Sequence, residues 1–107
     1  MLEIHNDTHF KQLLGQAAPF IVWFSASWCG PCRSINKPEL AAFAASHGVP
    51  LYYCDADAHH DIMSACRITQ VPTFLVFKDG KPGSQRVKGA DMNAIHALIK
   101  SVRQSRE

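Results

Sequence analysis

Two cysteines stand three positions apart in this chain, Cys29 and Cys32, with Gly30 and Pro31 between them. They follow a continuous apolar run and open a segment with helical periodicity, so the pattern predicts a dithiol at the start of a helix. The thiolate is the reactive form of cysteine, and the exposed N–H groups of a helix N-terminus favour negative charge. We therefore expect an accessible Cys29 to attack a substrate disulfide. Cys32, one turn further in and more buried, would then release the reduced product.

The same spacing is also half of a zinc site, which would need a second pair of ligands. The other two cysteines, Cys54 and Cys66, fall on different predicted elements, so we favour redox chemistry and predict no metal site. Cys54 is interpreted as a buried strand residue, because a free cysteine packs as a small apolar group. The neighbouring pair His59 and His60 indicates a solvated turn rather than a metal cluster.

Hydrophobic periodicity gives the elements that must position the dithiol. A first helix is capped by Asp7 or Thr8, and further helices are expected over residues 32–47, 57–66 and 91–102, with Asp57 as the cap of the helix over 57–66. Pro38 should kink the second of these helices. Strands are expected at 20–24, 51–54, 73–77 and 85–88, with an edge strand at 2–5. This order predicts an α/β fold with three α/β/α layers, in which a central mixed five-stranded sheet is flanked by four helices.

Composition narrows the possible functions. The chain has 107 residues, 47% of them hydrophobic and 19% charged, and a formal net charge of +2. This length suits one domain over residues 1–107, whose core needs no metal or disulfide staple. The basic residues are scattered, which argues against nucleic-acid binding. The longest apolar run, residues 19–24, is too short to cross a membrane, and we see no secretory leader. We expect a reducing, intracellular setting.

Trp28-Cys29-Gly30-Pro31-Cys32 resembles the active-site motif of the thioredoxin family. The similarity covers essentially the whole chain, with further segments in the family's order and at nearly its spacing. They are Val71-Pro72-Thr73, similar to the cis-proline loop, Phe77-Lys78-Asp79-Gly80, similar to the hairpin, and Gly89-Ala90, similar to a late substrate-contact loop. The stretch 24–28 is closer to eukaryotic cytosolic thioredoxins than to bacterial ones.

The resemblance implies the thioredoxin fold and a protein-disulfide reductase, with Cys29 as nucleophile and Cys32 as resolving thiol. Pro72 would pack beside the two sulfurs, and the Val71 backbone would pair with an extended substrate segment. The implied apolar rim around Cys29 consists of Trp28, Gly30, Pro31, Gly89 and Ala90. The resemblance also implies no bound cofactor, because electrons come from NADPH through a thioredoxin reductase. Disulfide-containing proteins would be the substrates of a cytoplasmic monomer. Eukaryotic thioredoxins often have an extra cysteine near the helix that carries Cys66, so Cys66 is either packing or a thiol that regulates the protein through oxidation or dimer formation.

The sequence departs from the family at several positions. Trp23 stands six residues before the first cysteine, where the family usually has a buried aspartate, and Tyr53 stands where many members have a lysine. The aspartate helps to move the proton of the resolving cysteine, so we expect slower attack by Cys32. Pro38 comes one residue later than usual. The hairpin over residues 80–89 is one residue longer, which should alter only a surface turn.

Two other functions remain open at this point. A disulfide oxidase or isomerase would share the fold, but such members usually place a histidine next to the second cysteine, whereas this chain has Gly30-Pro31. A binding or chaperone module with weak redox activity is kept open by the missing aspartate.

Overall fold

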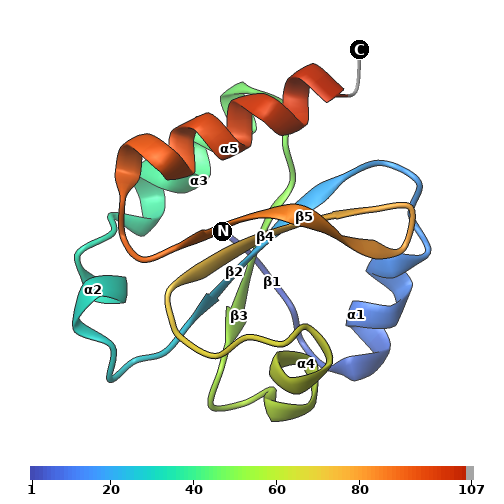
Figure 1. Cartoon of the computed structure of the whole chain (residues 1–107), viewed down its shortest axis with the longest axis horizontal. Helices are drawn as coiled ribbons and strands as arrows, with labels where there is room; N and C mark the ends of the chain where they lie inside the picture. The colour runs from blue at the N-terminus through green and yellow to red at the C-terminus, as the bar shows by residue number, and fades with distance from the viewer. Residues whose placement is uncertain (106–107) are drawn as a thin grey trace.

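The central strand β2 (Phe20–Ser25) is buried along its whole length, as its continuous apolar run predicts. In the computed structural model, which describes residues 1–105, the five-stranded sheet has the order β1-β3-β2-β4-β5 (Figure 1). β1 and β3 run parallel to β2, whereas β4 is antiparallel to β2 and β5 to β4. The predicted mixed sheet is confirmed. Its other strands are β1 (Leu2–Glu3), β3 (Leu51–Asp55), β4 (Thr73–Lys78) and β5 (Lys81–Lys88).

Alternating side chains of β2 divide the core into two parts. Ile21 and Trp23 pack with α3 and α5, whereas Phe20, Val22 and Phe24 pack with α1 and α4. Figure 1 shows these two pairs of helices on opposite sides of the sheet, so the predicted three layers are confirmed. No helix in the described part of the chain is long and apolar enough to span a bilayer. The covering helices are α1 (Asp7–Leu14), α3 (Lys37–Ser46), α4 (His60–Ala65) and α5 (Met92–Ser105).

The predicted kinked helix over residues 32–47 is instead two helices, α2 (Gly30–Arg33) and α3, so residues 1–105 contain five helices rather than four. Asn36 has an extended backbone (φ −76°, ψ 105°), and its Oδ1 accepts a hydrogen bond from the Glu39 N–H at 3.0 Å. This contact is an N-cap that starts α3. Pro38 therefore lies in the first turn of α3, where no N–H donor is needed, and the predicted kink is wrong.

Two other predicted helix caps are displaced. α1 is capped by Asn6, whose side chain accepts a backbone N–H, rather than by Asp7 or Thr8. α4 is preceded by His59, which makes no side-chain capping hydrogen bond, so Asp57 does not cap this helix.

The predicted Asp79-Gly80 turn joins β4 to β5. Both residues have positive φ, 54° and 76°, as in a two-residue hairpin turn that matches the twist of the strands. The register slips between the pairs Leu75–Arg86 and Phe77–Pro82, where one residue of β4 faces three residues of β5. The additional length of this hairpin is therefore a bulge inside the sheet, and the prediction of a longer surface turn is wrong.

Candidate active site

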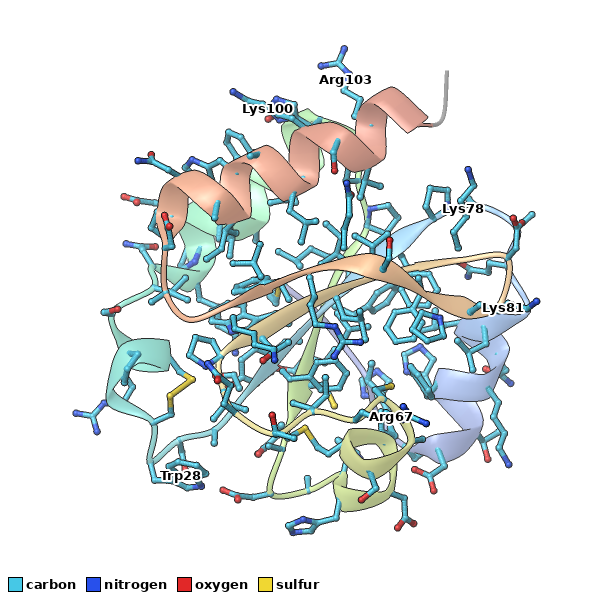
Figure 2. All side chains as sticks on the ribbon, viewed as in Figure 1. Trp28, Arg67, Lys78, Lys81, Lys100 and Arg103 are labelled. Carbon is cyan, nitrogen blue, oxygen red and sulfur yellow. A yellow bond between two sulfur atoms is a disulfide. The ribbon has the colours of Figure 1, made fainter. Side chains whose placement is uncertain are left out.

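Cys29 and Cys32 lie where the chain passes from β2 into α2, and their sulfurs form a disulfide, drawn in yellow beside α2 in Figure 2. Their Cα atoms are 5.3 Å apart. Cys29 is the N-cap of α2, and its Sγ accepts a hydrogen bond from the Cys32 N–H at 3.2 Å. Pro31 stands in the first turn, where its missing N–H costs nothing. The predicted position of the dithiol is confirmed, with a backbone donor directed at the sulfur that must carry negative charge.

The two cysteines are equally buried, each 4% exposed. The predictions of an accessible Cys29 and of a more buried Cys32 are both wrong, because the two cysteines pack in one small apolar cluster with Ala26 and Ala56. Exposure therefore does not distinguish the two sulfurs. The distinction between them rests on the N-cap position of Cys29.

The loop between α4 and β4 faces the disulfide. The Val71–Pro72 peptide bond is cis, as the resemblance implies, and the Val71 carbonyl oxygen lies 3.5 Å from Cys29 Sγ. The Gly89 N–H donates a hydrogen bond to the Pro72 carbonyl at 2.8 Å. Gly89 has a φ of 95°, a conformation that favours glycine. Three separate parts of the chain are thus linked by two contacts, one from Cys29 Sγ to Val71 and one from Gly89 to Pro72.

The predicted substrate-contact residues differ in their exposure. Trp28, Gly30 and Pro31 are exposed next to the disulfide in the chain, and Val71, Gly89 and Ala90 are half-buried. Pro72 is buried. Contact of these residues with a substrate stays a prediction.

Trp28 stands out from the surface beside the active site, 66% exposed (Figure 2). Its indole Nε1–H donates a hydrogen bond to Asp57 Oδ1 at 3.0 Å, and the Asp57 N–H donates to Asp55 Oδ1 at 2.9 Å. The turn after β3 therefore fixes the orientation of an exposed tryptophan. Sequence reasoning missed this role of Asp57 and assigned the residue to a helix cap. The available signal was the Asp-Ala-Asp sequence after β3, the strand next to β2.

Trp23 fills the core on the α3 and α5 side of β2. It is 2% exposed and stacks on Phe74, with ring centroids 5.4 Å apart. Its Nε1 is buried and has no hydrogen-bond partner. Ser25 and Thr73 are the buried polar residues within residues 1–103, so no carboxylate is buried in that part of the chain. The core around Trp23 thus offers an indole N–H and no carboxylate oxygen.

Tyr53, which the resemblance places at the position of a family lysine, packs edge-on against Trp23, with ring centroids 5.2 Å apart. Lys37 Nζ lies 3.6 Å from the centroid of the Tyr53 ring, a cation–π contact, and 4.0 Å from Glu3 Oε1. This lysine comes from α3 rather than from β3. Sequence reasoning missed it because a contact between a helix and a strand leaves no local sequence pattern.

Cys54 and Cys66 are free thiols buried in the core between the sheet and helices α1 and α4. Burial raises the pKa of Cys54 from 9.0 to about 12, and the neighbouring Cys66 and Asp55 raise it too. Burial raises the pKa of Cys66 to about 11, although Arg86 opposes the shift. Both thiols are therefore protonated at neutral pH and are weak nucleophiles. The regulatory alternative for Cys66 stays a prediction.

His59 and His60 line an open pocket with Asp61, His5 and Asp7. Within the described residues, no three His, Cys, Asp or Glu side chains are arranged so that they could hold a metal ion.

Dithiols that open a helix and face a cis-proline loop are arranged for disulfide exchange, so the fold and the site define a thiol–disulfide oxidoreductase. The thioredoxin family profile matches residues 1–101. Thioredoxin Asp f 28 of Aspergillus fumigatus is 30% identical over 103 residues, which cover 95% of this chain and 94% of that protein. A thioredoxin of Neurospora crassa is 34% identical, covering 92% and 84% of the two chains.

The solved structure of Malassezia sympodialis thioredoxin (Mala s 13) superposes with a TM-score of 0.86 at 31% identity, covering 95% of this chain and 92% of that one. This chain belongs to the thioredoxin family. It has the thioredoxin fold and is a disulfide reductase of the thioredoxin type.

Proposed function

We propose that this protein reduces disulfides in other proteins, with Cys29 as the attacking thiolate and Cys32 as the resolving thiol. Cys29 Sγ bonds to one substrate sulfur, the substrate S–S bond breaks, and the released thiolate takes a proton from water. Cys32, after losing its proton, attacks Cys29 Sγ, which re-forms their disulfide and frees the second substrate sulfur as a thiolate. The observation that carries this order is the hydrogen bond from the Cys32 N–H to Cys29 Sγ, which stabilises a thiolate at Cys29.

The substrate would bind as an extended segment beside Val71. The Val71 N–H donates to no group in the described part of the chain, and it can therefore pair with a substrate carbonyl as in β-strand addition. The exposed Trp28 indole, held by Asp57, supplies an apolar wall for this segment. Gly30, Pro31, Pro72, Gly89 and Ala90 would complete the contact surface.

The electrons would come from NADPH through a thioredoxin reductase, which re-reduces the Cys29–Cys32 disulfide after each cycle. Membership of the thioredoxin family supports this route. We further propose that the protein acts as a monomer in the cytoplasm. Its two buried free thiols suit a reducing compartment.

Insulin reduction tests the proposed activity. The protein should precipitate the insulin B chain with dithiothreitol as reductant, and also with NADPH and a thioredoxin reductase. Cys29→Ser should abolish the activity, and Cys32→Ser should trap a mixed disulfide on Cys29. Cys54→Ala is the matched control and should retain the activity. Reduction with dithiothreitol alone would indicate another electron donor, and no reduction with either donor would refute a reductase.

A binding or chaperone module is the second candidate, favoured by Trp23 at the position where the resemblance implies an aspartate, since the core cluster around Trp23 contains no acidic side chain. It predicts that a Cys29→Ser, Cys32→Ser double variant still suppresses aggregation of an unfolded client as well as the unmodified protein does. The Gly30-Pro31 pair argues against an oxidase or isomerase.

A further inference from the structure

Lys88 lies at the end of β5 that reaches the active site. Its register partner on β4 is Thr73, the residue directly after the cis-proline, and the next residue, Gly89, bonds to the Pro72 carbonyl at 2.8 Å. Paired residues of antiparallel strands have Cα atoms about 5 Å apart. Because Val71 is 3.5 Å from Cys29 Sγ, Lys88 stands beside the loop that touches the attacking sulfur.

The side chain of Lys88 is free to reach this surface. Val87 packs into the core beneath α5, so the alternation along β5 turns Lys88 to the opposite face of the sheet. Lys88 is exposed, and its ammonium is a mobile point charge on a flexible four-carbon stem.

Lys88 makes no ion pair within the described chain, where the ion pair present joins Lys37 to Glu3. Asp57, which accepts the Trp28 indole N–H, and Asp91, which accepts the Ala94 N–H at 3.2 Å, keep their negative charges, but neither is paired with Lys88.

A second exposed cation lies next to the dithiol in the chain. Arg33 follows Cys32 directly at the end of α2, and it also makes no ion pair. Two cations without an ion pair thus lie close to the dithiol, Lys88 beside the loop that contacts Cys29 Sγ and Arg33 next to Cys32 in the chain, and each attracts negative charge.

We propose that Lys88 is a specificity-determining residue, which gives this protein a preference for disulfides whose half-cystine is flanked by Asp or Glu. The inference rests on the proposed disulfide reductase function and names its substrate class. A carboxylate next to the attacked sulfur would pair with the Lys88 ammonium in the complex. An exposed ion pair of this kind is usually worth about 0.5–1 kcal/mol, which corresponds to a two- to five-fold preference in rate. Salt screens this attraction.

Matched peptides test this proposal. Three peptides with the same intramolecular disulfide would carry Glu, Gln or Lys beside the half-cystine, and single-turnover reduction by the pre-reduced protein would be followed by chromatography. The expected order of rate constants is Glu, then Gln, then Lys, with a ratio of about two to five between successive peptides at low salt. In 1 M NaCl the three rates should converge.

Variants assign the preference to one residue. Lys88→Gln should remove most of the ratio between the Glu and Lys peptides, and Lys88→Glu should reverse it. Lys100→Gln is the matched control, because Lys100 is exposed on α5, far from Trp28 in Figure 2, and should leave the ratio unchanged.

The outcomes separate this proposal from the function on which it rests. Equal, rapid reduction of all three peptides would overturn the specificity and leave the reductase function intact. A ratio that Lys88→Gln does not change, or that Lys100→Gln changes as much, would overturn the assignment to Lys88. No reduction of any peptide would overturn the reductase function itself.

Discussion

At the scale of single residues, we predict that Trp23 slows attack by Cys32, because it stands where the family resemblance implies a buried aspartate. Trp23→Asp is expected to speed resolution of the mixed disulfide several-fold at neutral pH, because a carboxylate at this family position can accept the Cys32 proton. The same change buries a charge beside Phe74 and Tyr53 and removes a large ring, so the free energy of unfolding should fall by about 3–5 kcal/mol. Stopped-flow release of a peptide thiol from its Cys29 adduct measures the rate, and urea unfolding measures the stability.

Trp23→Phe is the matched control for that experiment. It keeps an apolar ring and lacks the indole N–H that has no partner, so the resolution rate should stay within about two-fold of the original. A Trp23→Asp protein that folds yet resolves no faster would mean that another group already takes the Cys32 proton.

The two buried thiols should be chemically silent in the folded protein. With the pKa of Cys54 raised to about 12 and that of Cys66 to about 11, almost no thiolate exists at pH 7.5. Iodoacetamide is expected to label the reduced protein at the active-site dithiol within minutes, and the other two cysteines only after urea is added. Peptide mass spectrometry identifies which cysteines are labelled. Labelling of native Cys66 as fast as Cys29 would instead favour the regulatory alternative.

At the scale of secondary structure, the break between α2 and α3 depends on one polar side chain. Asn36→Ala removes the acceptor for the Glu39 N–H and should lower the free energy of unfolding by about 1 kcal/mol, the usual cost of losing an N-cap. Asn36→Asp keeps a capping oxygen and should stay close to the original stability. Urea unfolding of the three proteins measures the difference. Equal stability of the Ala and Asp variants would show that α3 does not need the cap.

The elements differ in how far the sequence could predict them. Strands β2, β3 and β4 and the Asp79-Gly80 turn were predictable because apolar runs and left-handed turn residues act locally. β5 was predicted only over residues 85–88, although it begins at Lys81, because its first half has no apolar pattern. The end of α2 was not predictable, because the apolar pattern continues into α3. Only the hydrogen bond from the Glu39 N–H to Asn36 marks the start of α3. The bulge in β5 was also hidden, since it depends on register against β4.

Some residues of the site could likewise be predicted from the sequence, and others could not. Cys29, Cys32 and the Val71–Pro72 loop follow from motifs at fixed spacing, and the structure brings them together. Two contacts were not predictable, the hydrogen bond of Asp57 to Trp28 and the position of Lys37 over Tyr53, because each joins side chains from separate elements. Equal burial of the two active-site cysteines likewise depends on the packing beneath both sulfurs.

At the scale of the whole molecule, the two faces of the sheet pack against different kinds of side chain. The α3 and α5 face is filled by large side chains around Trp23, and the α1 and α4 face encloses both free thiols, Cys54 and Cys66. Any unfolding that opens the second face exposes these thiols to water. The stability of the molecule should therefore depend on pH in the range where exposed thiols lose their protons.

The sign of that dependence follows from the two pKa values. An exposed thiol in the unfolded chain ionises near the ordinary value of 9.0, whereas the folded protein holds the protons of Cys54 and Cys66 up to about 12 and about 11. Below pH 9 the two buried thiols make their full contribution to the free energy of unfolding. Between pH 9 and 11 the unfolded chain binds fewer protons than the folded one, so the free energy of unfolding falls by about 1.4 kcal/mol per pH unit for each thiol.

Comparison with Cys54→Ala isolates this effect from lysine and tyrosine titration, which both proteins share. The stability advantage of the original protein over Cys54→Ala should shrink by about 2 kcal/mol between pH 8 and pH 10.5, because the variant lacks the thiol that ionises on unfolding. Urea unfolding at the two pH values measures both differences. An advantage that is the same at both would show that Cys54 ionises alike in the folded and unfolded chains, in conflict with its burial at the pairing of β2 with β3.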